Sequence, residues 1–201
     1  MDAKRQESRD VGEAKVTDGL KGKPLGLESG GIPNKRIKCS SYARKTPASC
    51  ARLNYPGCWC ADKRLDCWLQ VDLEYPHFVT GISTQGNPFG NSDFTKKYKL
   101  QYSLDGVGWT THVENGNQIF DANVDNTSVK TNDLQKVIVA RYIRICPVEW
   151  YCWPCLRIEL YGVPLKEVEK KKQERQIEEK KKKEEKQRKK REEEERLRKE
   201  G

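Results

Sequence analysis

Apolar and polar side chains alternate along much of the first 163 residues with a period of two, which is typical of half-buried β-strands. In the segment Trp68-Leu-Gln-Val-Asp-Leu73, three aliphatic side chains would face one way and the other three would face the opposite way. Further segments with strand character follow at short spacing: 36–41, 78–86, 98–102, 137–145 and 156–161. Many short strands in one domain favour an all-β sandwich or barrel.

Turn residues divide these strands. Asp105-Gly106 predicts a tight hairpin in which both central residues have positive φ. Residues 24–33 mix glycine and proline with a few aliphatic side chains, so we expect a tight lead into the first strands. Residues 1–20 are too polar to bury a core, and we expect them to be disordered.

The pattern changes at residue 164. Glu repeatedly precedes Lys or Arg by four residues between Leu165 and Glu200, an order that stabilises an isolated helix. The composition resembles that of a coiled coil, but no apolar heptad stripe is present. We therefore expect residues 164–201 to form a solvated single helix, about 54 Å long at 1.5 Å per residue.

The net charge of +9 is concentrated in this tail. Residues 164–201 carry 17 Lys and Arg against 12 Glu, a net of +5, which leaves +4 for residues 1–163. The domain is only mildly basic, and glutamates interrupt the basic residues of the tail. We therefore expect no nucleic-acid partner.

All eight cysteines lie between positions 39 and 155. An even number of cysteines in a short β-rich chain favours an oxidising compartment, so we expect an extracellular or cell-surface protein. The first 20 residues contain no apolar run that resembles a signal peptide, so a longer precursor or another export route is expected. The alternative is an intracellular scaffold in which the charged helix matters most.

Six sequence blocks, in this order, resemble those of discoidin domains, also called F5/8 type C domains. They are Pro24-Leu-Gly-Leu-Glu-Ser-Gly30, Trp68-Leu-Gln-Val-Asp-Leu73, Val79-Thr-Gly-Ile-Ser-Thr-Gln-Gly86, Tyr102-Ser-Leu-Asp-Gly106, Ala140-Arg-Tyr-Ile-Arg-Ile145 and Leu156-Arg-Ile-Glu-Leu-Tyr-Gly162. The resemblance implies an eight-stranded, jelly-roll-like barrel over residues 21–163. It also implies a binding or adhesion module, not an enzyme, with its ligand site in the loops, or spikes, at one end of the barrel.

The cysteine pattern is similar to that of the discoidin domain receptors. The resemblance rests on the segment Gly57-Cys-Trp-Cys60 and on Cys155, which opens the last strand. The resemblance implies a disulfide between Cys60 and Cys155. The family's usual bridge between the two ends of the domain would need cysteines near Lys21 and Val163, and neither is present. We therefore expect the two ends of the domain to be less securely fastened.

The remaining cysteines have no assigned partners. Cys58 and Cys67 flank the loop before the central strand and could staple it. Cys39 and Cys146 lie within expected strands and are more readily explained as buried thiols.

No cofactor or metal is expected, although the sequence does not decide whether a structural calcium ion binds. The close cysteine pairs 58/60 and 152/155 offer four thiols, but one residue between the first two is too few for a four-thiolate zinc site.

The expected spikes supply the candidate ligand site, at residues 42–49 and 87–93 with 59–63 beside them. The candidate ligand-binding residues are Tyr42, Arg44, Lys45, Trp59, Asp62, Lys63, Asn87, Phe89 and Asp93. Family members that bind membranes expose bulky apolar residues at the spike tips, and only Phe89 fits that description here. We therefore expect a glycan or an extracellular protein such as collagen as the partner, and an anionic membrane is less favoured. The match to collagen-binding relatives is partial, because Asn87 stands where they have an arginine.

Structural roles compete with these assignments. Trp59 and Trp68 are more often packing residues than ligand platforms, and Arg44 and Lys45 are as readily solvated charges. Three strand arginines, Arg141, Arg144 and Arg157, are expected to pair with carboxylates such as Asp72 or Glu159.

Two isolated histidines, His77 and His112, show no catalytic or metal-binding spacing and are expected at the surface. The sequon Asn126-Thr-Ser128 predicts N-glycosylation if the chain is secreted.

Overall fold

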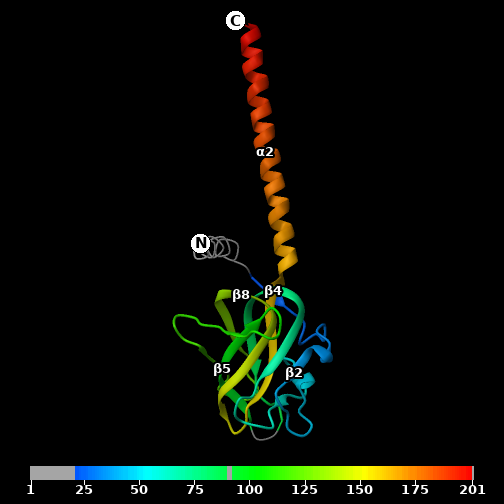
Figure 1. The fold of residues 1–201 in the computed structure, drawn as a ribbon, viewed down its shortest axis with the longest axis vertical. Helices are drawn as coiled ribbons and strands as arrows, with labels where there is room; N and C mark the ends of the chain where they lie inside the picture. Colours follow the sequence, from blue (N-terminus) through cyan, green and yellow to red (C-terminus); the bar gives the residue numbers. More distant parts are fainter. Residues whose placement is uncertain (1–20, 90–91, 201) are drawn as a thin grey trace. The chain divides into compact units, whose positions relative to one another are not determined.

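The computed structural model describes residues 21–89 and 92–200 (Figure 1). The chain divides into two units, a β-rich domain that ends at Pro164 and a helix that begins at Leu165. The expected disordered segment 1–20 lies outside the described residues. Among the described residues, no helix is both long enough and apolar enough to cross a bilayer.

The described part of the domain contains nine strands, and the pairings between them are antiparallel. They are β1 (Lys23–Pro24), β2 (Ile37–Cys39), β3 (Trp59–Cys60), β4 (Leu69–Gln85), β5 (Phe94–Ser103), β6 (Thr110–Thr111), β7 (Ile119–Asp121), β8 (Lys130–Tyr151) and β9 (Cys155–Pro164). Two short 3-10 helices, η1 (Asn34–Arg36) and η2 (Ala48–Cys50), lie between β1 and β3.

The expected all-β, jelly-roll architecture is confirmed, as a sandwich whose sheet is not a closed barrel. Its strands follow the order β1-β9-β4-β8-β5-β6, with β2 on β4, β3 on β9 and β7 on β5. The two strands at the ends of this path, β1 and β6, have two residues each and are not neighbours within the described residues. The ring of hydrogen bonds that a closed barrel requires is therefore open.

Long, irregular strands join the two layers. β4 merges the expected strands 68–73 and 78–86, and its register with β8 shifts between Asp72 and His77. Glu74, inside this irregular segment, has a φ of 74°. Such a bulge bends a strand, which lets the first half of β4 pair with β2 while the second half pairs with β9.

The core follows the alternation of the sequence. Leu69 and Val71 of β4 are fully buried and Leu73 is nearly so, as the period of two predicts. They pack in one cluster with Ile143 and Ile145 of β8. The central strand of the sequence therefore lies in the middle of the core.

The two ends of the domain are joined by backbone pairing in place of the family's usual disulfide. Lys23 lies opposite Gly162 in the β1–β9 pair, and Leu25 N donates to Leu160 O at 2.8 Å. A Cβ on Gly22 would lie 2.5 Å from Gly162 N, so the close approach of the two chain segments requires glycine there.

Glu159 fastens the same segment from inside the core. Its fully buried carboxylate accepts hydrogen bonds from Leu27 N at 3.2 Å and Glu28 N at 2.9 Å. The expected pairing of Arg157 with Glu159 is wrong, because each of these side chains binds backbone groups instead. Arg141 does pair with Asp72, at 2.9 Å, as expected.

The hairpin at Asp105-Gly106 is present, but its expected turn type is wrong. Of these two residues, Gly106 alone has a positive φ, of 78°, and the paired positions Tyr102 and Thr110 leave a longer loop between β5 and β6. The Asp105 carboxylate accepts hydrogen bonds from the backbone N–H groups of Val107 and Gly108, and these lower its pKa. This side-chain cap replaces the two-residue turn.

Both histidines are buried, so the expectation that they lie at the surface is wrong. His77 Nδ1 lies 2.8 Å from Tyr75 O, and burial lowers the pKa of His77. His112 Nε2 lies 3.0 Å from Glu114 Oε1, and its ring stacks on Phe120. Their rings pack against neighbouring aromatic groups, a role that isolated positions in a sequence do not reveal.

The helix α2 (Leu165–Glu200) is continuous, as the charge pattern predicts. Ion pairs in which Glu precedes Lys measure 2.7 to 2.8 Å, at 167/171, 178/182 and 185/189. Pairs in the reverse order, at 170/174, 180/184, 188/192 and 190/194, measure 3.4 to 4.0 Å. The shorter pairs have the orientation that suits the helix dipole.

Candidate functional site

The first spike and the loop after β3 are held against each other at one end of the domain. Ala43 N donates to Cys60 O at 2.9 Å, and Lys63 N donates to Ser41 Oγ at 3.3 Å. Lys45, in the first spike, has a φ of 71°, which is uncommon for a residue other than glycine. The two loops therefore form one continuous surface.

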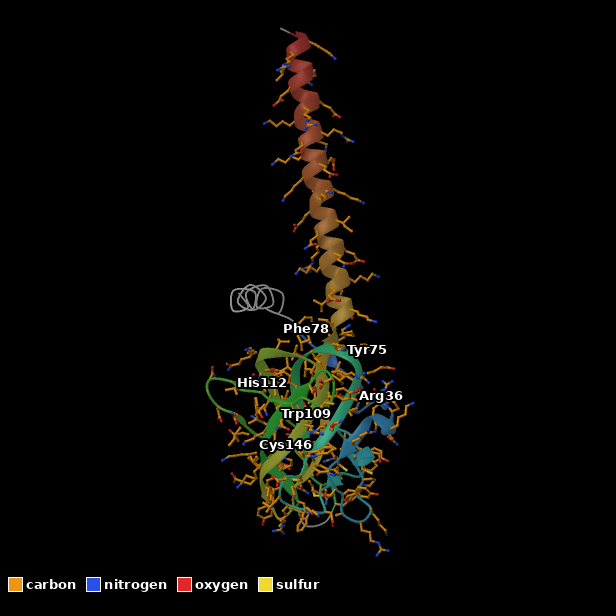
Figure 2. All side chains as sticks on the ribbon, viewed as in Figure 1. Arg36, Tyr75, Phe78, Trp109, His112 and Cys146 are labelled. Carbon is orange, nitrogen blue, oxygen red and sulfur yellow. A yellow bond between two sulfur atoms is a disulfide. The ribbon has the colours of Figure 1, made fainter. Side chains whose placement is uncertain are left out.

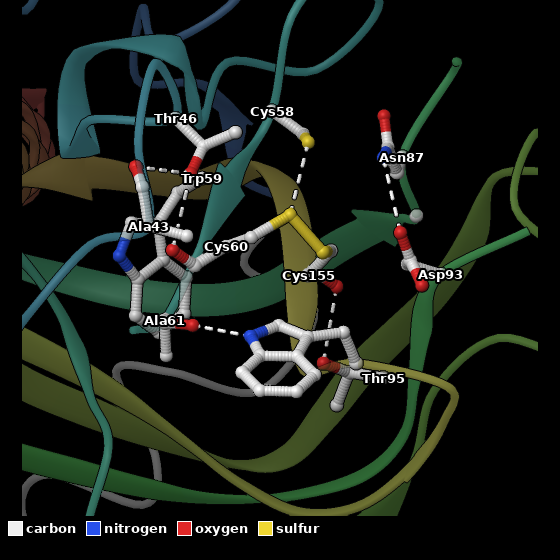
Figure 3. Close-up of a disulfide and its surroundings, with 12 residues drawn as sticks. Ala43, Thr46, Cys58, Trp59, Cys60, Ala61, Asn87, Asp93, Thr95 and Cys155 are labelled. Atoms are coloured by element: carbon white, nitrogen blue, oxygen red, sulfur yellow. Dashed lines mark hydrogen bonds between the residues drawn. A yellow bond between two sulfur atoms is a disulfide. The ribbon is translucent and has the colours of Figure 1, made fainter. Parts of the chain in front are cut away.

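A disulfide between Cys60 and Cys155 lies directly beneath these loops (Figure 3). It joins β3 to β9 where the two strands begin to pair. The pairing that the resemblance implied is thus confirmed. Trp59, in β3, is fully buried and donates from its indole Nε1 to Ser41 O at 2.9 Å. Its burial removes Trp59 from the candidate ligand-binding residues and agrees with the packing alternative.

The second spike is anchored to the same strand ends. Asn87 N donates to Asp93 O at 2.8 Å, and Asn87 Nδ2 donates to Asp93 Oδ2 at 3.3 Å (Figure 3). Both of these residues are half-buried. Just after the loop, Thr95 Oγ1 donates to Cys155 O at 3.1 Å. The two spikes and the disulfide therefore share one end of the sandwich.

Arg157 ties the loops of this end together from below. Its guanidinium donates to three backbone carbonyls: Gly86 at 2.8 Å, Tyr55 at 3.1 Å and Asn126 at 3.3 Å. Burial lowers the pKa of Arg157, but the carbonyl oxygens satisfy its donors. The positions of the loops thus depend on a buried cation that no ligand needs to touch.

The loop tips carry three large apolar side chains that are open to solvent. Tyr42 is 56% exposed, Leu65 is 80% exposed and Phe89 is 62% exposed. The sequence-based site omitted Leu65 because it ended the middle loop at residue 63. The sequence alone gave no signal for it, because a single leucine in a polar loop can face either the core or the solvent.

Charged residues surround these tips. Arg44, Lys45, Asp62 and Lys63 are all exposed, as a ligand site requires. Arg64, which the sequence-based site also omitted, stacks its guanidinium 4.1 Å from the centre of the Trp153 ring. The end surface therefore combines apolar tips with basic groups.

The glycosylation sequon lies beside the second spike. Asn126 is half-buried, and its Nδ2 donates to Asn87 O at 2.9 Å. Glycosylation at Asn126 stays a prediction.

A third sulfur lies against the disulfide. Cys58 Sγ is 3.3 Å from Cys60 Sγ, and the sulfurs of Cys58, Cys60 and Cys155 all lie within 4.8 Å of one another. Burial raises the pKa of the Cys58 thiol to about 12. With Cys60 and Cys155 oxidised, Cys58 supplies the free thiol of this cluster; a metal could use all three sulfurs only after reduction of the disulfide.

The possible staple between Cys58 and Cys67 is not formed, because both are free thiols. Cys39 and Cys146 are also free thiols, but they are only partly buried. Cys152 is exposed and does not join the sulfur cluster of the described residues.

Residues 36–160 match the family model of the F5/8 type C domain. The chain belongs to the F5/8 type C domain family. It is 40% identical over 154 residues to lactadherin of Sus scrofa, a match that covers 69% of this chain and 38% of lactadherin. It is 38% identical over 151 residues to coagulation factor V of Mus musculus, a match that covers 69% of this chain and 7% of factor V. The chain thus spans well under half the length of these relatives.

Solved structures show the same fold. Discoidin II of Dictyostelium discoideum has a TM-score of 0.61 and 25% identity, over 70% of this chain and 58% of discoidin II. A family 32 carbohydrate-binding module of C. perfringens NanJ, solved in complex with galactose, has a TM-score of 0.52 and 22% identity, over 65% of this chain and 96% of that module. The second likeness shows the fold alone. These structures confirm the fold family that the six sequence blocks indicated.

Proposed function

We propose that this F5/8 type C domain is a non-catalytic binding module that attaches to anionic phospholipid surfaces through its spike end. The observation that carries the proposal is the exposure of Tyr42, Leu65 and Phe89 on three separate loops at one end of the sandwich. Apolar tips can enter the interfacial region of a bilayer, where their burial is favourable. From the sequence, an anionic membrane was less favoured than a glycan or protein ligand, because only Phe89 counted as an apolar tip. The exposure of Leu65 and Tyr42 now favours the membrane.

Basic side chains beside the tips support the same ligand. Arg44, Lys45 and Lys63 are exposed on the two adjacent loops. Each basic residue near an anionic membrane surface contributes about 1 kcal/mol of attraction. Apolar insertion and charge attraction would therefore act together at this end.

An extracellular location is part of the proposal. The buried disulfide between Cys60 and Cys155 supports an oxidising compartment.

Sedimentation of the full chain with vesicles tests the membrane proposal. We expect it to pellet with vesicles that contain phosphatidylserine and to stay in the supernatant with phosphatidylcholine alone. The double substitution Leu65→Ser, Phe89→Ser should lower binding by about tenfold or more, because it removes two apolar tips. Equal binding of the wild type and this variant would overturn the site.

Val107→Ser is a matched control for that experiment. Val107 is 84% exposed in the loop after β5, whereas the second spike precedes β5. The ten residues of β5 separate these two loops by about 30 Å at 3.3 Å per residue. Loss of an exposed valine there should leave vesicle binding unchanged.

Glycan binding at the same end is the second candidate, favoured by the hydrogen-bonded pair Asn87 and Asp93. An amide and a carboxylate held together can bind adjacent sugar hydroxyls. Selective binding of neutral galactosides on a glycan array, lost in Asp93→Ala but unchanged in Leu65→Ser, would establish this candidate over the membrane.

A further inference from the structure

Arg144 lies on the outer face of the sheet, between two tryptophan rings. Its guanidinium carbon is 4.2 Å from the centre of the Trp68 ring and 3.7 Å from that of Trp109, which is labelled in Figure 2. Both tryptophans are half-buried. Both rings lie within contact of the guanidinium, which limits a ligand's approach to its remaining N–H groups.

This cation has no carboxylate partner among the described residues. Arg144 Nε donates to Gln70 Oε1 at 2.9 Å, which leaves the N–H groups of its two terminal nitrogens. The neighbouring acids are already engaged, Asp72 by Arg141 and Glu74 by Arg36. The expectation that Arg144 pairs with a carboxylate is therefore wrong, and its charge is not neutralised within the described structure.

Polar and basic side chains extend the same face across the strands. Gln70 of β4 and Gln101 of β5 lie on either side of Arg144 in the register of the sheet. Lys38 of β2 lies opposite Gln70, and Lys99 of β5 lies opposite Cys146. Neither lysine has an ion pair among the described residues, so the face carries unneutralised positive charge.

The hydrogen bonding of the indole N–H groups distinguishes Trp68 and Trp109 from two other tryptophans of the chain. Those of Trp59 and Trp153 donate to the backbone carbonyls of Ser41 and Ala61. Those of Trp68 and Trp109 have no protein partner in the described part of the chain. Two rings that contact Arg144 therefore carry indole donors without a partner in the described protein.

We propose that this outer face binds an acidic saccharide through a carboxylate or sulfate group. The face is defined by Lys38, Trp68, Gln70, Lys99, Gln101, Trp109 and Arg144. The open edge of a guanidinium matches two oxygens of such a group, and the stacked rings hold it in place before binding. Gln70 is buried and positions Arg144, whereas the partly exposed indoles and the Gln101 amide offer a sugar ring apolar surface and hydrogen bonds together.

Arg144, at the centre of this face, lies away from the spike end, whereas Trp68 at its edge follows Leu65 of the middle loop by three residues. Arg144 lies seven positions before Tyr151, the last residue of β8, which corresponds to about 23 Å at 3.3 Å per residue. The rigid sheet of this face also lacks the protruding apolar tips that favour insertion into a bilayer. The proposal therefore does not depend on the phospholipid ligand.

Nuclear magnetic resonance of the full chain tests the proposal, with a heparin-derived hexasaccharide for sulfate and a hyaluronan hexasaccharide for carboxylate. Helix α2 is also basic, so the readout is the indole N–H signals of Trp68 and Trp109, assigned with Trp→Phe variants, and not total binding. We expect at least one acidic hexasaccharide to shift both signals. Neutral chitohexaose should shift neither. Unchanged indole signals with both acidic sugars would overturn the proposal.

Three variants separate binding from a merely structural role. Arg144→Met should weaken the titrated indole shifts about tenfold or more, and Arg144→Lys, which keeps the charge but loses the planar edge, should weaken them several-fold. Lys38→Glu with Lys99→Glu alters only side chains at the surface and should weaken them about tenfold by reversing two charges.

The double variant Arg141→Gln, Asp72→Asn is the matched control, because it removes a paired arginine of the same strand together with its partner carboxylate, and it should alter affinity by less than about twofold. If Arg144→Met does not fold, the lysine variant decides the question. Wild-type affinity in that variant, or an equal loss in the Arg141→Gln, Asp72→Asn control, would overturn the proposal.

Discussion

The β-rich domain and helix α2 use the same charged residue types in opposite ways. In the domain, Arg157 and Glu159 are buried and bind backbone groups far away in the sequence. In the helix, Lys171 and Glu167 pair across one turn with both side chains about half-exposed or more. A charge in the domain thus holds one particular arrangement of loops, whereas a charge in the helix is one of many similar local contacts.

The largest expected effect concerns the disulfide, which links two distant parts of the domain's sequence. Cys155→Ser removes a bridge across 95 residues and should lower the free energy of unfolding by about 2–5 kcal/mol. Cys60→Ser should cost less, because Cys58 lies close enough to pair with Cys155 instead. Urea denaturation of both variants measures the difference.

Peptide mapping under non-reducing conditions provides the control for that comparison. Cys60→Ser should yield a peptide pair joined through Cys58 and Cys155. The combined variant Cys58→Ser, Cys60→Ser should lose as much stability as Cys155→Ser. Equal stability of the two single variants, with no new cross-link, would contradict the rescue.

The next effect concerns Arg157. Arg157→Met leaves three loop carbonyls without their donor and should lower the free energy of unfolding by about 3 kcal/mol. Vesicle binding should also weaken, because the carbonyls belong to the loops of the spike end. Arg175→Met in helix α2 is the matched control and should leave the unfolding of the domain unchanged. A stable Arg157→Met domain would show that the buried cation is dispensable.

A smaller effect should come from Asp72, whose charge is paired but partly exposed. Burial alone would raise the pKa of Asp72, but hydrogen bonds from Arg141 and from Glu74 N outweigh it, so the pKa is lower than usual. Its stabilising contribution is therefore present above the unfolded pKa of about 3.9 and is lost as the pH falls through the lower folded value. Asp72→Asn should lower the Tm at pH 7 by roughly 1–3 °C and flatten its decline in acid. An unchanged acid profile would assign that decline to other carboxylates.

The smallest effects per residue should come from the helix. Hydrogen bonds from Lys182 and Lys189 lower the pKa values of Glu178 and Glu185. Pairing therefore supports the helix above the unfolded glutamate pKa and is lost as the pH falls through the folded values. Circular dichroism of the full chain at about 222 nm should lose roughly a tenth to a quarter of its signal in acid or in about 1 M salt. Glu178→Gln alone should change little, whereas a loss as large as that in acid would contradict the redundancy of these pairs.

Some parts of the candidate site could be predicted from the sequence, and others could not. The family resemblance placed the expected spikes in loops between the strands, and Arg44 and Lys63 are exposed in those loops; that they bind a ligand stays a prediction. The ligand-binding role of Trp59 is wrong and its packing alternative is confirmed, because the sequence does not show whether a tryptophan beside a loop points inward or outward. Leu65 was missed because exposure depends on how the loop folds over its neighbours.

The sequence by itself determined the alternation that buries Leu69 and Val71, the continuous helix α2 and, through its resemblance to a family, the partnership of Cys60 with Cys155. The alternation and the helix depend on local periodicity, and the disulfide pairing came from sequence blocks shared with a family. Only the tertiary structure decided that Arg157 binds carbonyls, that Arg144 lies uncompensated between two indoles, and that the sheet stays open. Each of those outcomes depends on which distant strands become neighbours, and packing over the whole domain selects them, because no local pattern encodes a contact between residues far apart in the chain.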